Sequence, residues 1–306
     1  MLIDSISVIF TAFDFIALAL IFTLVIAGVW LAPATSSAER IPRRRLLLLS
    51  LIVTALCGAL DLLFRTAVLA DVSPLDAFEF IPKVVGQSEY GSYWLVRATM
   101  WLLMLITFIW IRRGQRGFIP CVVLISGALF TLLMISTTSH AGENGVWTAI
   151  NLINWLHLVS ISAWGGAVLL YAYIVLPVLI RGSLTQKIAS ASARLSMLAT
   201  IALIFVLSTG IFNSWRQIGE LSNLWTSDYG EILIVKVALV SVMMLIGAIN
   251  RFYLVPRVEQ WGNHPNKKDK KIVARFQAVL RVDSVLFVTI ILAAVILGMQ
   301  SPPAHL

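Results

Sequence analysis

Charged residues are scarce in this chain of 306 residues. Asp, Glu, Lys and Arg together make up 12% of it, about half of the share that is typical of a soluble globular domain. Hydrophobic residues make up 59%, and the mean hydropathy is +0.91. This composition excludes an ordinary water-soluble domain. It predicts helices that cross a membrane, because lipid cannot hydrogen-bond an exposed backbone.

Cysteine and histidine are also scarce, with two and four copies. Cys57 and Cys121 lie within or at the edge of apolar runs. They show neither metal-binding spacing nor a disulfide framework, which is typical of small packing residues. The sequence also lacks a hydrolytic triad, a phosphate-binding loop and a dinucleotide-binding fingerprint. We therefore expect no enzymatic activity, no catalytic residue and no cofactor-binding residue.

Long apolar runs recur from one end of the chain to the other. A helix needs roughly 20 apolar residues to cross the bilayer core, and eight runs come close to or exceed that length. The predicted spans are 5–31, 46–70, 93–111, 118–138, 148–179, 195–215, 231–255 and 276–299. The predicted fold class is an all-α membrane protein with eight transmembrane helices.

The loops between these spans alternate in charge. Basic residues follow the first, third, fifth and seventh spans: Arg40, Arg43, Arg44 and Arg45; Arg112, Arg113 and Arg116; Arg181, Lys187 and Arg194; Arg251, Arg257, Lys267, Lys268, Lys270, Lys271 and Arg275. The loop after the second span is acidic. By the positive-inside rule the basic loops are cytoplasmic and both termini face outside. Topology thus explains the net charge of +8 without a nucleic-acid partner.

A weak internal repeat relates the first and fifth spans. "FDFIALALIFT" resembles "WLHLVSISAWG", which matches Asp14 with His157 and Pro33 with Pro177 within one residue. Four helices duplicated to eight keep the same orientation. The pattern predicts two parallel four-helix halves, residues 1–139 and 140–306.

Polar residues inside the predicted spans are candidate functional positions, because burying them in lipid is costly. On the expected orientation, most lie in or near the outer half of the membrane: Asp14, Asp61, Arg65, Met134, His140, Glu143, Thr209, Asn213, Lys236, Met299 and His305. Asp283, near Arg281, lies in the inner half. Structural explanations stay open: Asp61 and Arg65 can pair, and Lys236 can snorkel to the interface.

The fifth span contains a titratable ring in the stretch "NWLHLVSISAWGG". His157 shares one helix face with Asn151, Asn154, Ser160 and Trp164, at spacings of three or four residues. Two interpretations stay open for His157, a hydrogen bond that bridges helices and a metal ligand.

Several stretches resemble the copper resistance protein D (CopD/PcoD) family of bacterial inner-membrane proteins. They are "SHAGENGVWTAINLINWLHLVSISAWGG", "LSTGIFNSW", "DYGEILIVKVALVSVMMLIGAINRFYLVPR" and the ending "SPPAHL". The match is strong from His140 onward and weaker over the first four spans. The resemblance implies eight transmembrane helices, copper handling, a periplasmic CopC-like copper-binding partner, and His140 and His157 as ligands.

The chain departs from the family pattern at two positions. Asp14 stands where members often carry a histidine, which weakens the case for a symmetric site of two histidines. Asp283 stands where members often carry a glutamate. The phosphorylation motif of a P-type ATPase is absent, so copper movement should be passive or coupled to a gradient.

The metal candidates are His140, His157, Met134, Met299 and His305, and the other functional candidates are Asp14, Asp61, Trp164, Asn213, Lys236 and Asp283. Imidazole and thioether suit Cu(I), and imidazole with carboxylate suits Cu(II). The leading hypothesis is copper transport or handling at the bacterial inner membrane. In it, copper is received on the periplasmic side by His140 and then His157, with Asp14 compensating charge.

Two functions of other classes remain as alternatives. A membrane redox protein would bind haem or quinone, but only His157 lies within a span, whereas bis-histidine haem needs a pair. A scaffold would hold a periplasmic copper chaperone at the membrane without moving copper.

Overall fold

The computed structural model describes residues 2–114, 117–264 and 270–305, and every regular element in these ranges is helical. Arg116, Lys267 and Lys268 lie outside the described residues, as do the side chains of Lys270 and His305. Eight helical stretches within the described ranges are long and apolar enough to cross a membrane: Ser7–Leu31, Ser37–Ala70, Glu89–Arg112, Phe118–Thr137, Ala149–Arg181, Thr185–Ile218, Asp228–Asn263 and Lys271–Gly298. The predicted all-α fold with eight spans is confirmed.

Several helices continue past the predicted spans into the basic segments. Hydropathy delimits only the part that suits lipid, whereas the backbone can stay helical beyond it. In chain order the elements are α1 (Leu2–Ile26), η1 (Ala27–Leu31), α2 (Ser37–Ala70), η2 (Asp76–Glu79), α3 (Ile81–Gln87), α4 (Glu89–Arg112), α5 (Phe118–Thr137), α6 (Ala149–Leu170), η3 (Tyr171–Val175), α7 (Leu176–Arg181), α8 (Thr185–Ile218), α9 (Asn223–Thr226), α10 (Asp228–Ile249), η4 (Asn250–Leu254), α11 (Val255–Asn263), α12 (Lys270–Gly298) and η5 (Pro303–His305).

The chain forms two compact units. Unit 1 consists of Met1–Phe22 and Leu47–Val159, and unit 2 consists of Thr23–Leu46 and Ser160–Leu306. Helices α1, α2 and α6 therefore each contribute to both units. The division into halves 1–139 and 140–306 concerns sequence similarity and stays a prediction.

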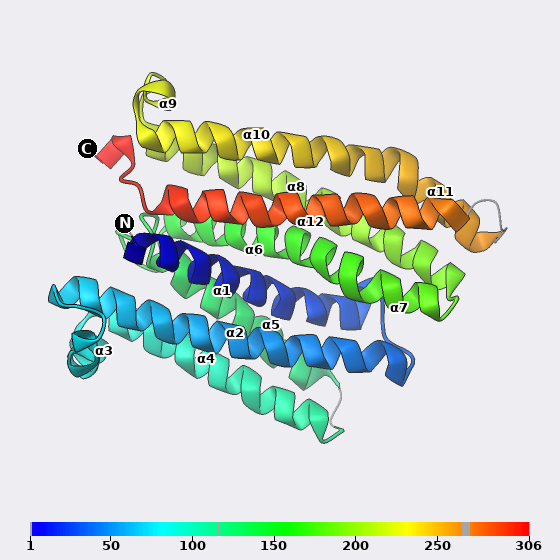
Figure 1. Ribbon diagram of the computed structural model, residues 1–306, viewed down its shortest axis with the longest axis horizontal. Coiled ribbons are helices and arrows are strands. Elements are labelled where there is room, and N and C mark those ends of the chain that lie inside the picture. Colours follow the sequence, from blue (N-terminus) through cyan, green and yellow to red (C-terminus); the bar gives the residue numbers. More distant parts are fainter. Residues whose placement is uncertain (1, 115–116, 265–269, 306) are drawn as a thin grey trace. The chain divides into compact units, whose positions relative to one another are not determined.

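Unit 1 is held together by close packing and by tryptophan hydrogen bonds. Helix α4 packs along α5 (Figure 1), and a Cβ at Gly127 would lie 2.7 Å from the Met104 side chain, so this approach requires glycine. On the other side of α4, the Trp94 indole donates to the Gly58 carbonyl at 2.9 Å, and Trp101 donates to the Leu51 carbonyl at 2.7 Å. The two pairs fix an antiparallel register between α4 and α2.

Unit 2 packs α10 along α12 and α8 along α11 (Figure 1). Gly165 of α6 faces the Phe287 ring of α12 so closely that an added Cβ would overlap it. The Tyr171 hydroxyl, fully buried, lies 3.0 Å from the Ser192 hydroxyl and donates to the Ile188 carbonyl at 3.2 Å. These contacts join α6, η3, α8 and α12 into one core.

Three π-helical segments share one local cause. Each of η1, η3 and η4 is followed, two residues after its end, by a proline: Pro33, Pro177 and Pro256. A proline ring clashes with the carbonyl four residues back and supplies no N–H to it. A single wider turn accommodates the proline, and a hydrogen bond to the residue five back closes it. Segments η1 and η3 precede Pro33 and Pro177, the two prolines that the weak internal repeat matches.

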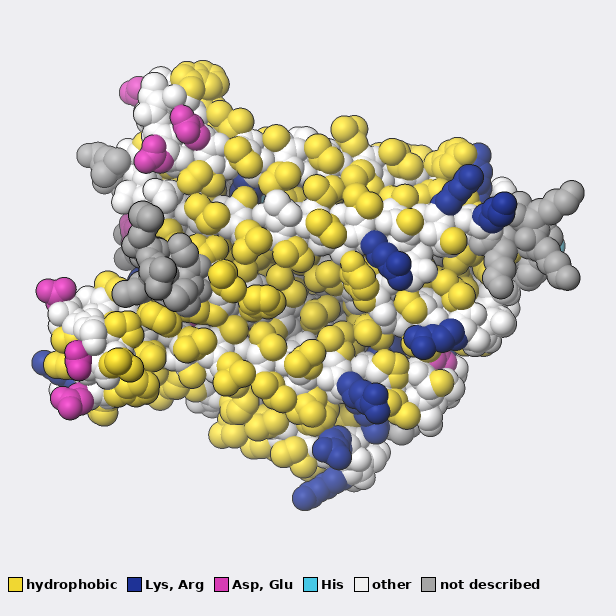
Figure 2. All heavy atoms as spheres, viewed as in Figure 1, with side chains coloured by type: hydrophobic (Ala, Val, Ile, Leu, Met, Phe, Trp, Pro, Cys, Tyr) yellow, Lys and Arg dark blue, Asp and Glu magenta, His cyan; other side chains and the backbone are white. Residues whose placement is uncertain are grey.

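Each unit segregates charge to its ends and presents apolar side chains between them (Figure 2). In unit 2 acidic side chains gather around α9 and basic ones around α7 and α11, and in unit 1 acidic side chains gather around α3 and basic ones near the end of α4. The surface between includes highly exposed residues such as Val68, Leu245 and Phe252. Such a surface suits contact with lipid tails.

Candidate functional site

A polar network in unit 1 ties the last turn of α5 to the first turns of α6. Asn151, fully buried, donates to the Thr137 hydroxyl at 2.9 Å and to the Val146 carbonyl at 2.8 Å, and its Oδ1 accepts from Ser136 at 2.7 Å. Asn154 donates to Ser136 at 2.9 Å and to Ser139 at 3.3 Å. Because these buried groups satisfy one another, the network fixes how the loop after α5 meets α6.

His157 lies one turn beyond this network, about 4.5 Å further along the α6 axis than Asn154. Its side chain is buried, with a residue exposure of 8%. Asn151, Ser160 and Trp164 of the predicted polar face are also buried, and Asn154 is half-buried. The face identified from spacing is therefore the face that α6 turns toward protein.

His140 lies in the loop that the network anchors, directly after Ser139. Its ring is partly exposed, and its Nδ1 lies 3.2 Å from Oε1 of Glu143. A neutral ring that donates from Nδ1 to a carboxylate keeps its lone pair on Nε2, the arrangement that carboxylate–histidine pairs give to metal ligands. Met134, buried on α5, lies two residues before Ser136. Three of the five predicted ligand residues, Met134, His140 and His157, are thus brought to one end of α5 and α6.

The other two predicted ligands belong to unit 2. Met299 is exposed just after α12, and His305 ends η5. Within the described part of the chain, no group of three or more His, Cys, Asp and Glu side chains is arranged to hold a metal ion. The candidate donors of unit 1 are two imidazoles and a thioether, ligand types that suit Cu(I).

The second polar cluster of unit 1 is a buried ion network that includes Arg97. The Arg97 guanidinium bonds Oδ2 of Asp14 at 2.6 Å and Oδ2 of Asp61 at 3.1 Å, and the Tyr90 hydroxyl donates to the same Asp61 oxygen at 2.8 Å. The predicted Asp61–Arg65 pair is wrong: Arg65 is exposed, with its guanidinium 5.6 Å from the centre of the Tyr90 ring. The reason is that Arg97 reaches Asp61 from the neighbouring helix α4.

The same network gives Asp14 a partner that the sequence did not indicate. Its carboxylate, at 6% exposure, forms an ion pair with Arg97, and its expected role beside the metal stays a prediction. Sequence reasoning missed Arg97, although the rule that selected Asp14 also applies to an arginine inside the span 93–111.

The remaining candidates lie in unit 2. The Asn250 amide donates to the buried carboxylate of Asp283 at 2.9 Å. Trp164 is buried, and Asn213 is half-buried. Lys236 is half-buried, and the ion pairs and hydrogen bonds found among the described residues do not include it.

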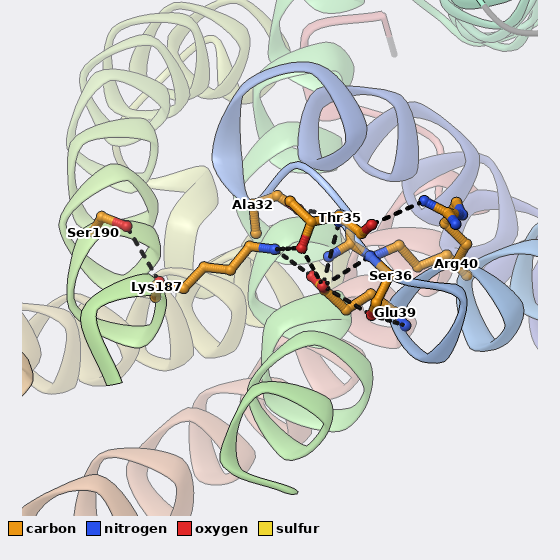
Figure 3. Close-up of polar contacts among 8 residues, drawn as sticks. Ala32, Thr35, Ser36, Glu39, Arg40, Lys187 and Ser190 are labelled. Carbon is orange, nitrogen blue, oxygen red and sulfur yellow. Dashed lines mark hydrogen bonds and ion pairs between the residues drawn. The ribbon is translucent and has the colours of Figure 1, made fainter. Parts of the chain in front are cut away.

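A third polar network lies at the basic end of unit 2 (Figure 3). Ser36 and Glu39 form a reciprocal cap at the start of α2, because Glu39 Oε1 accepts from the Ser36 backbone at 3.3 Å and Ser36 Oγ accepts from the Glu39 backbone at 3.4 Å. Lys187 of α8 contacts Oε2 of Glu39 at 2.6 Å and donates to Thr35 at 3.1 Å. This network was not predicted, although the Ser-x-x-Glu spacing is a known helix-start signal.

Two arginines complete this end by capping carbonyls at the end of the first span. Arg43 donates to the Ala32 carbonyl at 2.7 Å, and Arg194 donates to the Trp30 carbonyl at 2.6 Å. These carbonyls lie where the helix stops, so they have no partner in a following turn. Basic residues here both follow the positive-inside pattern and stabilise the turn between α1 and α2.

Comparisons with known proteins agree on one family. A family model described as copper resistance protein D matches residues 189–297, and one described as copper resistance protein D-like, N-terminal domain, matches residues 1–150. The chain is 31% identical to inner membrane protein YebZ of Escherichia coli (strain K12) over 251 residues, which cover 80% of this chain and 83% of that protein.

Two further relatives are more distant. Copper resistance protein D of Pseudomonas syringae pv. tomato is 24% identical over 255 residues, 79% of this chain and 80% of that protein. Copper transport protein CutJ of Bacillus subtilis (strain 168) is 26% identical over 268 residues, 85% of this chain and 46% of that protein. No solved structure matches the chain.

Proposed function

The chain belongs to the copper resistance protein D family, and on that premise we propose that it transports copper across the bacterial inner membrane and contributes to copper homeostasis or resistance. Two relatives are named for copper resistance and copper transport, and a third is named as an inner membrane protein. Copper is the cargo in this proposal. The protein acts as a transporter and not as an enzyme.

One observation carries the proposal: a half-exposed and a buried histidine at one end of α5 and α6 in unit 1. His140 is the first ligand that copper meets, and the Glu143 carboxylate orients its ring. The Ser139–Asn154 hydrogen bond anchors the His140 loop one turn from His157. His157 and Met134 are the next donors, and their burial removes copper from water.

We assign this end of unit 1 to the periplasmic side. The positive-inside rule supports the assignment, because the loops at the opposite ends of the neighbouring spans carry the arginines and lysines. On this orientation both termini are periplasmic, and a CopC-like periplasmic protein can deliver copper to His140. Among the described histidine side chains only His157 is buried, which disfavours haem held by two histidines.

The experiment is copper uptake into sealed liposomes that contain the purified protein, with copper content measured on the same preparation. His157→Ala and His157→Asn should both fold and both lose copper binding and uptake, because neither side chain offers an imidazole. His264→Ala is the matched control, since His264 is exposed beyond α11 at the basic end. Wild-type copper affinity in His157→Ala would end the ligand hypothesis, and copper binding without uptake would favour the scaffold.

A further inference from the structure

Unit 2 contains a cavity of about 290 Å³, bounded by α6, α8, α10, η4, α11 and α12. Most of its lining is apolar and aromatic, with Leu203, Phe276 and Leu280 among the lining residues. One carboxylate, Asp283, lines the cavity, and the lining contains neither histidine nor cysteine. The cavity lies outside unit 1, which holds the histidine pair.

Two buried acceptor oxygens in this lining lack a donor. Asp283 is 4% exposed and Asn250 is 8% exposed. The Asn250 amide donates to Oδ2 of Asp283, which leaves Oδ1 of each residue without a hydrogen-bond partner. A buried acceptor in this state is costly unless a donor or a cation reaches it.

The charges around Asp283 do not pair with it. Arg251 lines the same cavity from η4, but its guanidinium donates to Ser196, at 3.1 Å from that hydroxyl. On α12 itself, Arg281 lies 5.9 Å from the centre of the Tyr173 ring. The lining residues from α6, α8, α10 and α11 carry no charge. Among the described residues Asp283 has no ion pair, so no direct contact within them offsets a negative charge on it at membrane depth.

We propose that Asp283 and Asn250 form an intramembrane proton site, whose proton exchanges with the positive charge of copper during transport. The proposal rests on the copper function proposed above. A proton bonded to Asp283 Oδ1 neutralises the carboxylate while the cavity holds no cation. When a singly charged copper ion enters, the O–H bond breaks, the proton passes to water, and the net charge of the cavity is unchanged.

The same cavity offers contacts for a soft cation. Trp164 and Met244 both line it, and an aromatic face and a thioether both attract such an ion. Such contacts suit an ion in transit, and the proton restores neutrality after the ion leaves.

The first test uses infrared difference spectra of the metal-free protein in lipid membranes, recorded across a range of pH. Wild type should show the carbonyl band of a protonated carboxyl group, and the band should be absent in Asp283→Asn. It should persist in Asp228→Asn, the matched control, since Asp228 is exposed at the start of α10. An unchanged band in a folded Asp283→Asn protein would overturn the proton site.

A second variant tests the pairing. Asn250→Leu removes the amide donor that favours the ionised carboxylate, so the pH of half-protonation should move upward. An unmoved midpoint would overturn the role given to Asn250. Thermal melting of each variant shows whether the fold persists.

Adding Cu(I) distinguishes proton–copper exchange at Asp283 from copper transport itself. At fixed pH, copper should diminish the band in wild type, and an imposed proton gradient should change copper uptake in wild type but not in Asp283→Asn. Copper uptake that ignores both the gradient and Asp283 would overturn the exchange and leave copper transport standing. A titrating band without any copper uptake would keep the proton site and overturn both copper transport and the exchange.

Discussion

Replacing Arg97 with Met should destabilise the protein more than replacing any other single charge in unit 1. The guanidinium holds two carboxylates, Asp14 at 2.6 Å and Asp61 at 3.1 Å, and its own side chain is 10% exposed. Removing one partner of a buried ion pair costs about 3–5 kcal/mol, because the other charge remains buried without compensation.

The cost should fall in steps for related variants. Asp14→Asn keeps an acceptor for Arg97 and leaves the Asp61 contact, so we expect about 1–3 kcal/mol. The double variant Asp14→Leu/Arg97→Met removes both members of the buried pair and should cost less than Arg97→Met alone, because only Asp61, whose side chain is 36% exposed, is then left without its cation. Arg65→Met should be nearly neutral, since the ion pairs found among the described residues do not include this exposed cation.

The assay is the free energy of unfolding in mild detergent, followed by tryptophan fluorescence. Arg65→Met is the informative control, because a pair between Asp61 and Arg65 is what the spacing of four residues predicts. Equal losses in Arg65→Met and Arg97→Met would refute the network as drawn. A double variant that loses as much as the sum of its single variants would refute the argument from stranded charge.

Three further predictions concern other parts of the chain. Glu39→Lys should lower thermal stability by placing two cations together, and the exchange Glu39→Lys with Lys187→Glu should recover part of the loss in the same melting assay. Gly165→Leu should unfold unit 2 or abolish expression, because the side chain would occupy the space of the facing phenylalanine ring of α12. Gly28→Leu should be tolerated, because a Cβ at Gly28 would have no neighbour within 4 Å. A single cysteine at position 305 should react with an impermeant reagent added to intact cells freed of their outer membrane, and one at position 268 should not; the reverse pattern would invert the orientation.

The spans could be predicted because each segment that crosses the lipid must be apolar by itself. A run such as 118–138 is apolar over the length of a bilayer core whatever its neighbours are, and the structure has α5 at Phe118–Thr137. The ends were less predictable where charge begins. The helix that contains the run 195–215 starts at Thr185, because helical turns outside the apolar run need only their backbone hydrogen bonds and not lipid.

Pairing between helices could not be predicted in the same way. Asp14 and Arg97 are 83 residues apart, and nothing local to either position says that α1 and α4 bring them together. Asp61 and Arg65 looked like a pair because spacing along one helix is visible in the sequence. In the structure the Arg97 guanidinium contacts one oxygen of each carboxylate, and it does so from a different helix.

The histidine face of α6 could be predicted in part. Helical periodicity placed Asn151, Asn154 and His157 on one side, and burial follows that side. The periodicity could not predict the conformation of the loop before α6, which depends on the hydrogen bond from Asn154 to Ser139. The two asparagines hydrogen-bond within the network that fixes the loop, and His157 lies one turn further along α6. The comparison of His157→Ala with His157→Asn therefore decides whether this imidazole bridges helices or binds metal.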